Sequence, residues 1–408
     1  MSALLEQLTS LLFVSLPRRD QRNWANVYLR GLVSTKGRKT IRNISGGEAG
    51  AVEQNLQQFI SKSPWDWTPV RRTLAQHLES SVQRPLAWVV QSMIIEKAGD
   101  RSVGVGRQFV PQLGRMANCQ QATGIWFASS DASFPVEWSL TLPAPWTTEL
   151  YRSRARIPDT ARSRTPTEDA LHAVLRMAET WQLQRRPVMM DVANAELPQV
   201  IETFSARDIP FVLKVEGTLP VVLAATGRHK TTLYTASARE LIDSLRSQRR
   251  PVEWPRHGRA DDAATPLVAA TVHPVGVDGY AAGAQPLLLL GAWTDPANAM
   301  PSEFWIANIP DLPLAQLFLL AKLTDRVALD FAEVSEPVGI RDFEGRSFRG
   351  WHHHATLASI AHAAALLSSR TYAPPSARVS SGAVVPPQGR PHGEPRHGHG
   401  AAQWEFIR

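Results

Sequence analysis

The chain has 408 residues, of which 43% are hydrophobic and 20% charged, and its formal net charge is +7. This length and apolar content are typical of a globular protein of two or three domains. The single cysteine, Cys119, excludes an internal disulfide and favours a reducing, cytoplasmic compartment. We expect no membrane partner, because no apolar run approaches the length of about 20 residues that spans a bilayer and no signal peptide is recognisable.

The positive charge is concentrated near the N-terminus. Between Ser15 and Arg42, eight basic residues face one acid, Asp20, so this segment carries a net charge of +7 and the remainder is close to neutral. Contacts from Lys and Arg to phosphates supply the sequence-independent part of DNA affinity. The segment is either a contact surface for a polyanion or an ordinary solvated basic face, and charge alone leaves both readings open.

Residues 1–82 are predicted to form an N-terminal helical domain that binds DNA. Pro64 disfavours helix for the residue before it, so it separates two helical stretches. The predicted elements are a turn at Gly46-Gly47, a helix from Glu48 to Ser61 and a helix from Thr68 to Ser80.

Residues 83–215 change to short apolar strands and then to alternating strands and helices. The first four predicted strands are Leu86 to Val90, Ser102 to Phe109, Thr123 to Ala128 and Val136 to Leu142. They are followed by a helix at 167–184, a strand at 187–191, a helix at 196–207 and a strand at 211–215. This alternation predicts a mixed α/β sheet with parallel strands.

Residues 216–311 break that rhythm and are predicted to form an inserted, mainly β subdomain. Its predicted elements are strands near Val221, at 267–272 and at 287–290, and a helix at 237–247 that begins with a capping box of Ser237 and Glu240. Residues 312–370 return to the main domain, with helices predicted from Leu312 to Glu336 and from Thr356 to Ser368. Residues 371–408 are rich in Ala, Pro, Gly, Ser and His, and we expect a disordered tail.

The segment from Leu86 to Phe109 carries the most specific motif, in which an apolar strand is followed by Lys97, Gly99 and the run Ser102-Val-Gly-Val-Gly-Arg-Gln108. Other blocks follow the same order as in one known family: Tyr28-Leu-Arg-Gly-Leu32, Ser63-Pro-Trp-Asp-Trp67, Asn118-Cys-Gln120, Val136-Glu-Trp138 and Phe343-Glu-Gly-Arg-Ser-Phe-Arg-Gly-Trp-His-His-His354. From about Phe13 to Leu367 the chain resembles the DDE-type transposases of the insertion sequence 701 family.

This resemblance implies a ribonuclease H-like mixed sheet with an N-terminal helical domain and an inserted mainly β subdomain. It also implies three acids that hold two divalent metal ions, which activate the nucleophile and stabilise the leaving oxygen during phosphoryl transfer on DNA. Three positions depart from that pattern. Gln91 and Ser92 stand where the resemblance places an aspartate pair, and Ala328, counted back from Glu344-Gly-Arg346, stands at the third acid. Asp191 is the retained acid. We therefore expect no intact catalytic site, no metal and no cofactor.

Neighbouring acids are poor substitutes for the missing ones. Asp330 lies two positions beyond Ala328, a rotation of about 200° around a helix, and Glu333 lies five positions beyond it. Glu96 and Asp100 are expected in the loop after the first strand, so they would have to fold back to reach the site.

Several other residues have structural explanations. Asp191 alone can remain as a residue that caps the turn after its strand, and Cys119 is expected to be a packed thiol. Consecutive histidines on a helix point in different directions, so His352, His353 and His354 are interpreted as structural, and the tail histidines His392, His397 and His399 as compositional. Core packing is the expected role of Trp65, Trp67, Trp88, Trp126 and Trp138.

The favoured hypothesis is a degenerate, domesticated transposase that binds double-stranded DNA, as a homodimer, and acts as a regulator without cutting it. Its location would be the cytoplasm, at the nucleoid when bound to DNA. The predicted DNA-binding residues are Arg18, Arg19, Arg22, Arg38, Lys39, Arg42, Arg71, Arg72, Lys97, Arg107 and Arg346. The alternative is an active, Mg²⁺-dependent transposase with a displaced metal site built from Asp191 with Glu96 or Asp330. A third hypothesis is a platform that binds other proteins.

Overall fold

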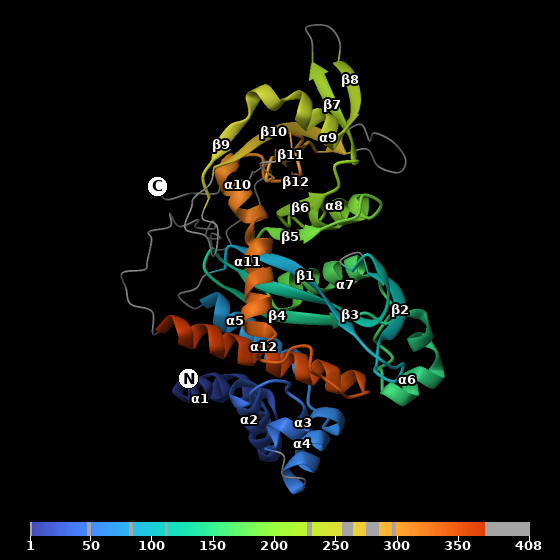
Figure 1. Ribbon diagram of the computed structural model, residues 1–408, viewed down its shortest axis with the longest axis vertical. Helices are drawn as coiled ribbons and strands as arrows, with labels where there is room; N and C mark the ends of the chain where they lie inside the picture. Colours follow the sequence, from blue (N-terminus) through green and yellow to red (C-terminus); the bar gives the residue numbers. More distant parts are fainter. Residues whose placement is uncertain are drawn as a thin grey trace, which may run out of the picture. The chain divides into compact units, whose positions relative to one another are not determined.

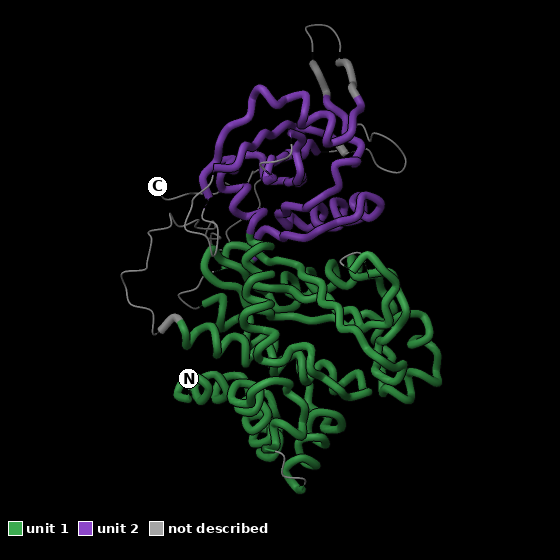
Figure 2. The backbone as a smooth tube through the Cα atoms, viewed as in Figure 1, with its two compact units in different colours: residues 1–184, 323–372 green, residues 185–322, 373–408 purple. Residues whose placement is uncertain are grey.

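The computed structural model describes residues 2–46, 50–80, 85–110, 113–226, 231–254, 264–274, 285–295 and 299–371. The expected tail beyond Thr371, with His392, His397 and His399, lies outside these residues, as do Gly47 and Glu48. The chain divides into two compact units (Figure 2), one of residues 1–184 and 323–372 and one of residues 185–322 and 373–408. The boundaries of the five predicted domains remain a prediction.

The N-terminal part of the first unit is helical, as predicted. Its helices are α1 (Ser2–Leu12), the short η1 (Phe13–Ser15), α2 (Arg19–Ser34), α3 (Ile41–Ile44), α4 (Ala51–Lys62) and α5 (Trp67–Ser80). Along α2, Ala25, Tyr28, Leu29 and Leu32 are buried, a spacing of three and four residues that places them on one face. Gly31 lets α3 approach α2 closely, since a Cβ there would stand 2.2 Å from Ile44 Cγ2.

The sheet of the first unit is built around one long strand (Figure 1). This strand, β3 (Arg115–Ala128), pairs antiparallel with β1 (Ala87–Glu96) along one edge and with β2 (Val105–Val110) and β4 (Ser133–Leu140) along the other. The strand predicted to end at Val90 therefore continues to Glu96, because its pairing with β3 continues and the apolar residues Met93 and Ile95 remain buried.

Helices cover both faces of this sheet. On one face, Thr123 of β3 donates a hydrogen bond from Oγ1 to the carbonyl of Pro166 (3.4 Å), the first residue of α7 (Pro166–Leu175). On the other, Trp138 of β4 donates from Nε1 to Ser359 Oγ (3.0 Å) on α12 (Phe348–Thr371). Helix α12 begins eight residues before the predicted start at Thr356. The sequence did not predict α6 (Glu149–Ala155) or the turn η3 (Ala144–Thr147), and α7 ends in a π-helical turn, η4 (Arg176–Thr180).

The second unit combines a βαβ motif with an antiparallel extension. Strands β5 (Val188–Asp191) and β6 (Phe211–Val215) pair in parallel and are joined by α8 (Leu197–Ser205), as predicted. The order continues from β6 through β12 (Glu303–Ala307), β11 (Leu287–Ala292), β10 (Thr265–Pro274) and β7 (Pro220–Thr226) to β8 (Thr231–Ser237), with β9 (Arg250–Val252) on β10. The inserted region is mainly β, and the predicted capping box of Ser237 and Glu240 starts α9 (Ala238–Ser244).

The helix predicted from Leu312 to Glu336 is divided into three pieces. These are α10 (Leu314–Ala321), α11 (Leu323–Asp330) and the π-helical turn η6 (Phe331–Ser335). The boundary between the two units falls between Lys322 and Leu323, between α10 and α11. Among the described residues, no helix is both long enough and apolar enough to cross a membrane.

Buried histidines attach α12 to the rest of the first unit. His353 lies between the carbonyl oxygens of Ile60 and Trp65, 2.9 Å from each. His354 Nδ1 lies 2.9 Å from the hydroxyl of Tyr28, and its Nε2 lies 2.9 Å from the carbonyl oxygen of Gly339. Their rings point toward different elements, and Trp65 stacks on His353 with 3.7 Å between ring centroids. The contacts of His353 and His354 therefore hold α12 in place, which is a structural role.

Burial lowers the pKa of these rings, to about 3 for His353 and about 4 for His354 and His362. The unfolded chain, whose histidines titrate near 6.5, therefore binds more protons than the folded chain between pH 6.5 and pH 4. For His354 and His362, whose carbonyl acceptors lie at one ring nitrogen only, the stability that the neutral ring contributes is complete above pH 6.5 and is lost as the pH falls through this window.

We predict that the free energy of unfolding decreases between pH 7 and pH 5 by about 2 kcal/mol for each such histidine. In His354→Gln, which does not titrate, the decrease should be smaller by that amount, whereas His77→Gln, at a partly exposed position on α5, should follow the wild type. Urea unfolding at pH 7, 6 and 5 measures the difference. Identical slopes for His354→Gln and the wild type would contradict the prediction.

Candidate functional site

The two positions that depart from the family pattern on β1 face opposite sides of the sheet. Gln91 pairs with Gly124, which pairs with Trp138, while Ser92 pairs with Thr123. Directly opposed residues of antiparallel strands share a face. Because Trp138 contacts α12 and Thr123 contacts α7, Gln91 lies on the α12 face and Ser92 on the α7 face. Both are partly buried, mid-strand residues, and the Gln91 amide donates to the carbonyl of Ser92 (3.3 Å).

Ala328 lies on α11, which packs against β1. Its neighbour Val327 is fully buried, whereas Ala328 itself is exposed. Of the two β1 positions, only Gln91 lies on the sheet face that α12 also covers. The pair of positions at which the resemblance places the first and third acids therefore holds an amide and a methyl group.

Asp330 is committed to a structural role. Its side chain is 1% exposed, and its Oδ2 accepts hydrogen bonds from the backbone N (2.7 Å) and Oγ (2.8 Å) of Ser133 and from Arg326 Nε (2.8 Å). Its Oδ1 accepts a further bond from Arg326. These bonds fix α11 to the start of β4 and use both carboxylate oxygens.

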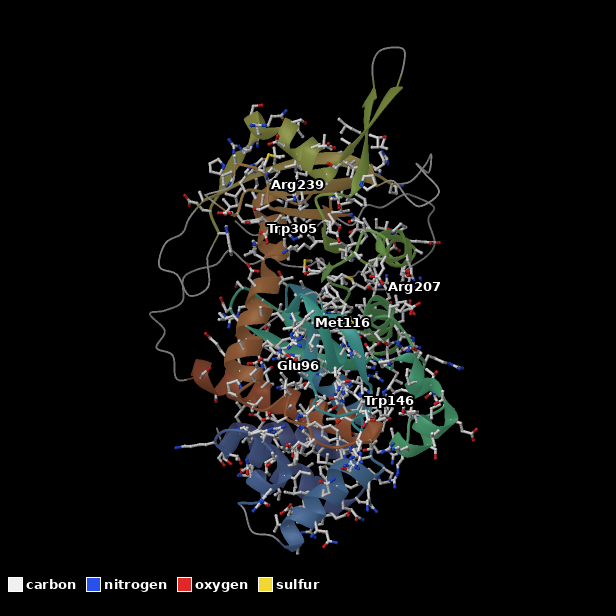
Figure 3. The ribbon with its side chains drawn as sticks, turned by 45° about the vertical axis from the view of Figure 1, so that its right-hand side comes forward. Glu96, Met116, Trp146, Arg207, Arg239 and Trp305 are labelled. Carbon is white, nitrogen blue, oxygen red and sulfur yellow. The ribbon has the colours of Figure 1, made fainter. Side chains whose placement is uncertain are left out.

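The other acids considered as replacements are also poorly placed. Glu96 is five residues beyond Gln91, so its side chain leaves the opposite face of the strand, about 17 Å along it. It is exposed and pairs with Arg115 (2.7 Å), as its position at the end of β1 allows (Figure 3). Asp100 and Glu333 are exposed, the first in the loop after β1 and the second in η6.

Asp191 belongs to the second unit, where it is the exposed last residue of β5. In the parallel pairing with β6 it stands opposite Lys214, whose ammonium donates to Glu303 Oε1 (3.2 Å). Burial by itself would raise the pKa of Glu303, but Lys322 and Lys214 hold it below its ordinary value. Lys214 is therefore the residue that pairs with Asp191 across the two strands.

The donor set does not fit a pair of divalent metal ions. Mg²⁺ and similar hard cations need oxygen ligands, with carboxylates to supply the charge. Of the four positions, Gln91 and Ser92 offer only uncharged oxygens, Ala328 offers no ligand atom, and Asp191 alone offers a carboxylate. Within the described parts of the chain, no group of three or more Asp, Glu, His or Cys side chains is arranged to hold a metal ion.

Five of the predicted DNA-binding residues belong to segments that approach residues 343–346 or their neighbours, and we call this surface the basic cleft. A cavity of about 430 Å³ lies there; its charged lining residues are Lys39, Arg42, Glu53, Asp342 and Glu344, so Arg42 is the one residue of the five that lines it. Arg38 pairs with Glu344 (3.1 Å), and Lys97 donates to the carbonyl of Phe343 (2.9 Å). The residues of the basic cleft are Arg38, Arg42, Lys97, Arg107 and Arg346.

Two of these are included because of their neighbours in the chain or in the sheet. Arg346 follows Gly345 directly, and Arg107 stands opposite Asn118, whose amide donates to the carbonyl of Lys97 (2.7 Å). Arg38, Arg42, Arg107 and Arg346 are exposed, and Lys97 is half-buried. Burial is also the main reason that the pKa of Lys97 lies below its ordinary value.

The remaining predicted residues lie elsewhere. Arg18, Arg19 and Arg22 are at the start of α2, about 24 Å along that helix from Ser34. Arg18 pairs with Asp20 (3.6 Å), and Arg22 donates to the carbonyl of Leu16 (2.8 Å). Arg72 is exposed on α5.

Lys39 and Arg71 differ from the other predicted DNA-binding residues, because both side chains are largely buried. Lys39 is 5% exposed; its ammonium donates to the carbonyl of Thr35, and its backbone N donates to Asp342 (2.8 Å). Arg71 is 1% exposed and contacts four different residues inside the first unit.

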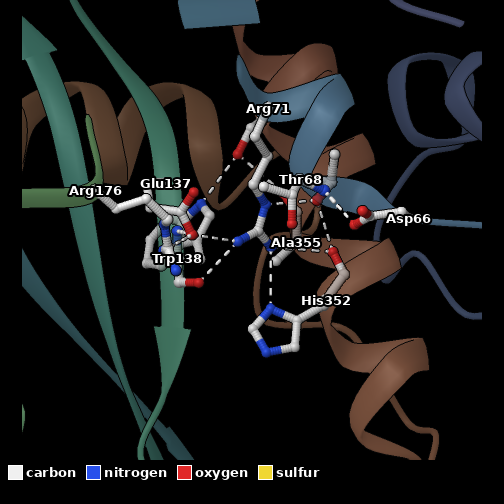
Figure 4. Close-up of polar contacts among 10 residues, drawn as sticks. Asp66, Thr68, Arg71, Glu137, Trp138, Arg176, His352 and Ala355 are labelled. Carbon is white, nitrogen blue, oxygen red and sulfur yellow. Dashed lines mark hydrogen bonds and ion pairs between the residues drawn. The ribbon is translucent and has the colours of Figure 1, made fainter. Parts of the chain in front are cut away.

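The Arg71 guanidinium is the centre of a buried network that the sequence did not predict (Figure 4). It donates to Glu137 Oε1 (2.8 Å), the carbonyl of Trp138 (2.7 Å), Thr356 Oγ1 (2.7 Å) and His352 Nδ1 (3.2 Å). The network joins α5, β4 and α12. Its signal in the sequence is the position of Glu137 within the Val-Glu-Trp block, but nothing there identifies Arg71 as its partner.

The aromatic residues also pack inside the protein. Trp88 and Trp126 are fully buried, with Phe127 stacked on Trp88, and Trp67 stacks on His352 with 4.5 Å between ring centroids. Cys119 is buried with Val110 and Ala117. None of these side chains is positioned as a platform for bases.

Comparison with known proteins identifies the family. Residues 11–273, more than half of the chain, match the model of the DDE superfamily endonucleases. The chain belongs to this family. It is also 28% identical over 142 residues to the probable transposase of insertion sequence element IS701 from Microchaete diplosiphon, a match that covers 34% of this chain and 34% of that protein. The chain thus spans about a third of this relative's length.

The mixed α/β architecture agrees with the ribonuclease H-like fold expected of a DDE superfamily endonuclease. The matched residues include Gln91, Ser92 and Asp191, whereas Ala328 lies beyond them. The correspondence of Ala328 with the third acid therefore rests on the Glu-Gly-Arg block that follows it.

The structural role of Asp330 can be measured. Asp330→Asn removes the charge that pairs with Arg326 in a buried position, and we expect it to lower the free energy of unfolding by about 3–5 kcal/mol. Glu333→Gln, an exposed carboxylate three residues away, should change it by less than about 0.5 kcal/mol. Urea unfolding of both variants checks this. A loss below about 1 kcal/mol for Asp330→Asn would show that the carboxylate is available for another role.

Proposed function

We propose that this protein is a transposase-derived DNA-binding regulator that binds double-stranded DNA and does not cut it. The observation that carries the proposal is the combination of Gln91 and Ala328 on β1 and α11 with an Asp330 whose oxygens are all used internally. Two-metal phosphoryl transfer requires several carboxylates around one point. The first unit supplies none at the two positions where the family pattern requires them.

The basic cleft supports DNA as the partner. Its five cationic residues come from three segments far apart in the sequence, namely 38–42, 97–107 and 346. Four of them are exposed, and Arg42, Arg107 and Arg346 have no acidic partner among the described residues. Guanidinium groups that are exposed and unpaired are available to phosphates, and each phosphate neutralised adds to affinity through counterion release. We further propose that the protein acts as a homodimer at the nucleoid, within the cytoplasm.

DNA binding should depend on the basic cleft and on salt. In the triple variant Arg42→Gln, Arg107→Gln and Arg346→Gln, the negative slope of log K against log salt concentration should become shallower by about 2.7, or about 0.9 for each lost phosphate contact. Fluorescence anisotropy with duplex DNA from the flanks of the gene, at 50 to 200 mM salt, measures this slope.

A matched triple variant, Arg154→Gln, Arg185→Gln and Arg207→Gln, removes the same charge at exposed positions that are not residues of the basic cleft. It should retain the wild-type slope. Equal effects of the two triple variants would show that DNA binding depends on the net charge of the protein and not on the basic cleft. Absent or salt-insensitive binding by the wild type would contradict the proposal and favour a protein-binding platform.

Restoring the carboxylates provides a second test. The wild type should not cleave flanking DNA with Mg²⁺ or Mn²⁺, while Gln91→Asp with Ala328→Glu should gain metal-dependent nicking that disappears when Asp191→Asn is added. Ser92→Asp with Ala328→Glu is the matched control and should remain inactive, because position 92 faces α7. Wild-type cleavage that depends on Asp191 would instead support the alternative, an active transposase with a displaced metal site.

A further inference from the structure

A second cavity in the first unit is lined by an unusual set of charged side chains. It has a volume of about 330 Å³ and lies between β4, the segment 158–164, α7 and the start of α12. Its charged and titratable lining residues include Arg162, Arg164, Arg176, Glu137, Asp169 and His352. It has no lining residue in common with the basic cleft.

The proton on His352 can be assigned from its neighbour. Arg71 has only donors, so its contact at 3.2 Å with His352 Nδ1 requires a lone pair on that nitrogen. Burial, followed by the charge of Arg71, holds the pKa of His352 well below its ordinary value, so the ring is neutral and carries its proton on Nε2. The residue is 5% exposed, and none of the described residues provides an acceptor for Nε2.

Arg176 presents a second donor of this kind. One of its terminal nitrogens pairs with Glu137 Oε1 at 3.0 Å, but its buried Nε has no hydrogen-bond partner in the described chain. A buried donor without an acceptor costs roughly 1–3 kcal/mol. Both residues line the cavity, but these two nitrogens are themselves shielded from solvent, so contacts to a ligand there would come from other atoms of the lining.

The charges around the cavity favour an anionic acceptor. Three guanidinium groups, of Arg162, Arg164 and Arg176, face two carboxyl groups. Glu137 is already shared between Arg176 and the buried Arg71. Burial raises the pKa of Asp169 to about 7, against the opposing effect of Arg164, so this carboxyl group carries only part of a charge at neutral pH. The lining is therefore positive overall.

The wall of the cavity is fixed in place before any ligand binds. Arg152 of α6 donates to the carbonyl oxygens of Ala161 (3.1 Å) and Pro158, and Ser163 Oγ donates to the carbonyl of Leu142 (2.7 Å). These bonds hold the backbone on both sides of Arg162. A preformed wall reduces the ordering cost of binding.

We propose that this cavity binds a phosphate group, held by Arg162, Arg164 and Arg176. Arg guanidinium groups are suited to phosphate because they donate two parallel hydrogen bonds with fixed geometry. The phosphate belongs either to a small free ester or ion, or to the terminus or backbone of DNA. The inference is independent of the proposed regulatory function, because it uses other residues.

The test is calorimetric titration of the full-length protein with inorganic phosphate at pH 7. The wild type should show saturable binding at one site per chain, and Arg162→Gln with Arg164→Gln should weaken it at least tenfold. Arg154→Gln, an exposed arginine on α6 outside the lining, is the control and should bind as the wild type does. Arg162 is exposed and Arg164 is partly exposed, so the double variant should fold, which circular dichroism checks.

Competition between inorganic phosphate and duplex DNA, prepared with and without a 5′-phosphate, distinguishes a free phosphate from a DNA phosphate as the ligand. If the site takes a DNA phosphate, inorganic phosphate should compete with DNA, and the competition should disappear in the double variant. If it takes a free phosphate, both ligands should bind at once. No saturable phosphate binding, or equal binding by the wild type and the double variant, would overturn the inference, whereas the salt slope of the basic cleft tests the regulatory function separately.

Discussion

The first unit depends on a buried guanidinium. Arg71 extends from α5 between the edge strand β4 and helix α12, and its five N–H groups are directed at a carboxylate, two carbonyl oxygens, a hydroxyl and an imidazole. A buried charge is tolerated only when it is paired and hydrogen-bonded, so α5, β4 and α12 must be in their native arrangement for Arg71 to be accommodated at all. Removing one partner of such a pair typically costs about 3–5 kcal/mol. The N-terminal helices are thereby coupled to the sheet.

The same sheet explains why a carboxylate at position 91 or 328 could not easily be replaced by a neighbouring acid. Positions along a strand alternate between faces, so of Gln91 and Ser92 only the first lies on the α12 side. On helix α11, residues two positions apart also face different sides. Ala328 is exposed, whereas Asp330 is buried and bound to Ser133 and Arg326. A carboxylate one or two residues away in sequence is therefore on the wrong side or already used. The fold itself rests on packing and on the contacts of Arg71, so it does not require carboxylates at positions 91 and 328.

Elements with a local signal could be predicted from the sequence. The strand Phe211–Val215 and the capping box of Ser237 and Glu240 were predicted correctly, since apolar runs and caps involve residues close in sequence. The extent of β1 was underestimated because its second half, from Gln91 to Glu96, is specified by pairing with β3 and not by its own pattern. Helix α12 was placed too late for a similar reason, since its first turns contain polar histidines whose partners lie far away, at Ile60, Trp65 and Tyr28.

At the candidate site, too, residue identities could be predicted from the sequence, whereas features that depend on long-range contacts could not. The identities of Gln91, Ser92 and Ala328 can be read directly, but whether Asp330 could replace a missing acid depended on Ser133, 197 residues away. Arg71 and Lys39 looked like surface cations because long-range partners cannot be read from composition. The charge of the N-terminal segment indicated a polyanion partner, while the approach of Arg38 and Lys97 to Phe343 and Glu344 is visible only in three dimensions.

The central proposal is that the protein holds no catalytic metal ions, and Mn²⁺ binding tests it most directly. Electron paramagnetic resonance of the full-length protein titrated with Mn²⁺ counts bound ions without requiring a DNA substrate. The account predicts no high-affinity Mn²⁺ in the wild type and bound Mn²⁺ in Gln91→Asp with Ala328→Glu. Tight, stoichiometric Mn²⁺ binding by the wild type that is lost in Asp191→Asn would contradict it.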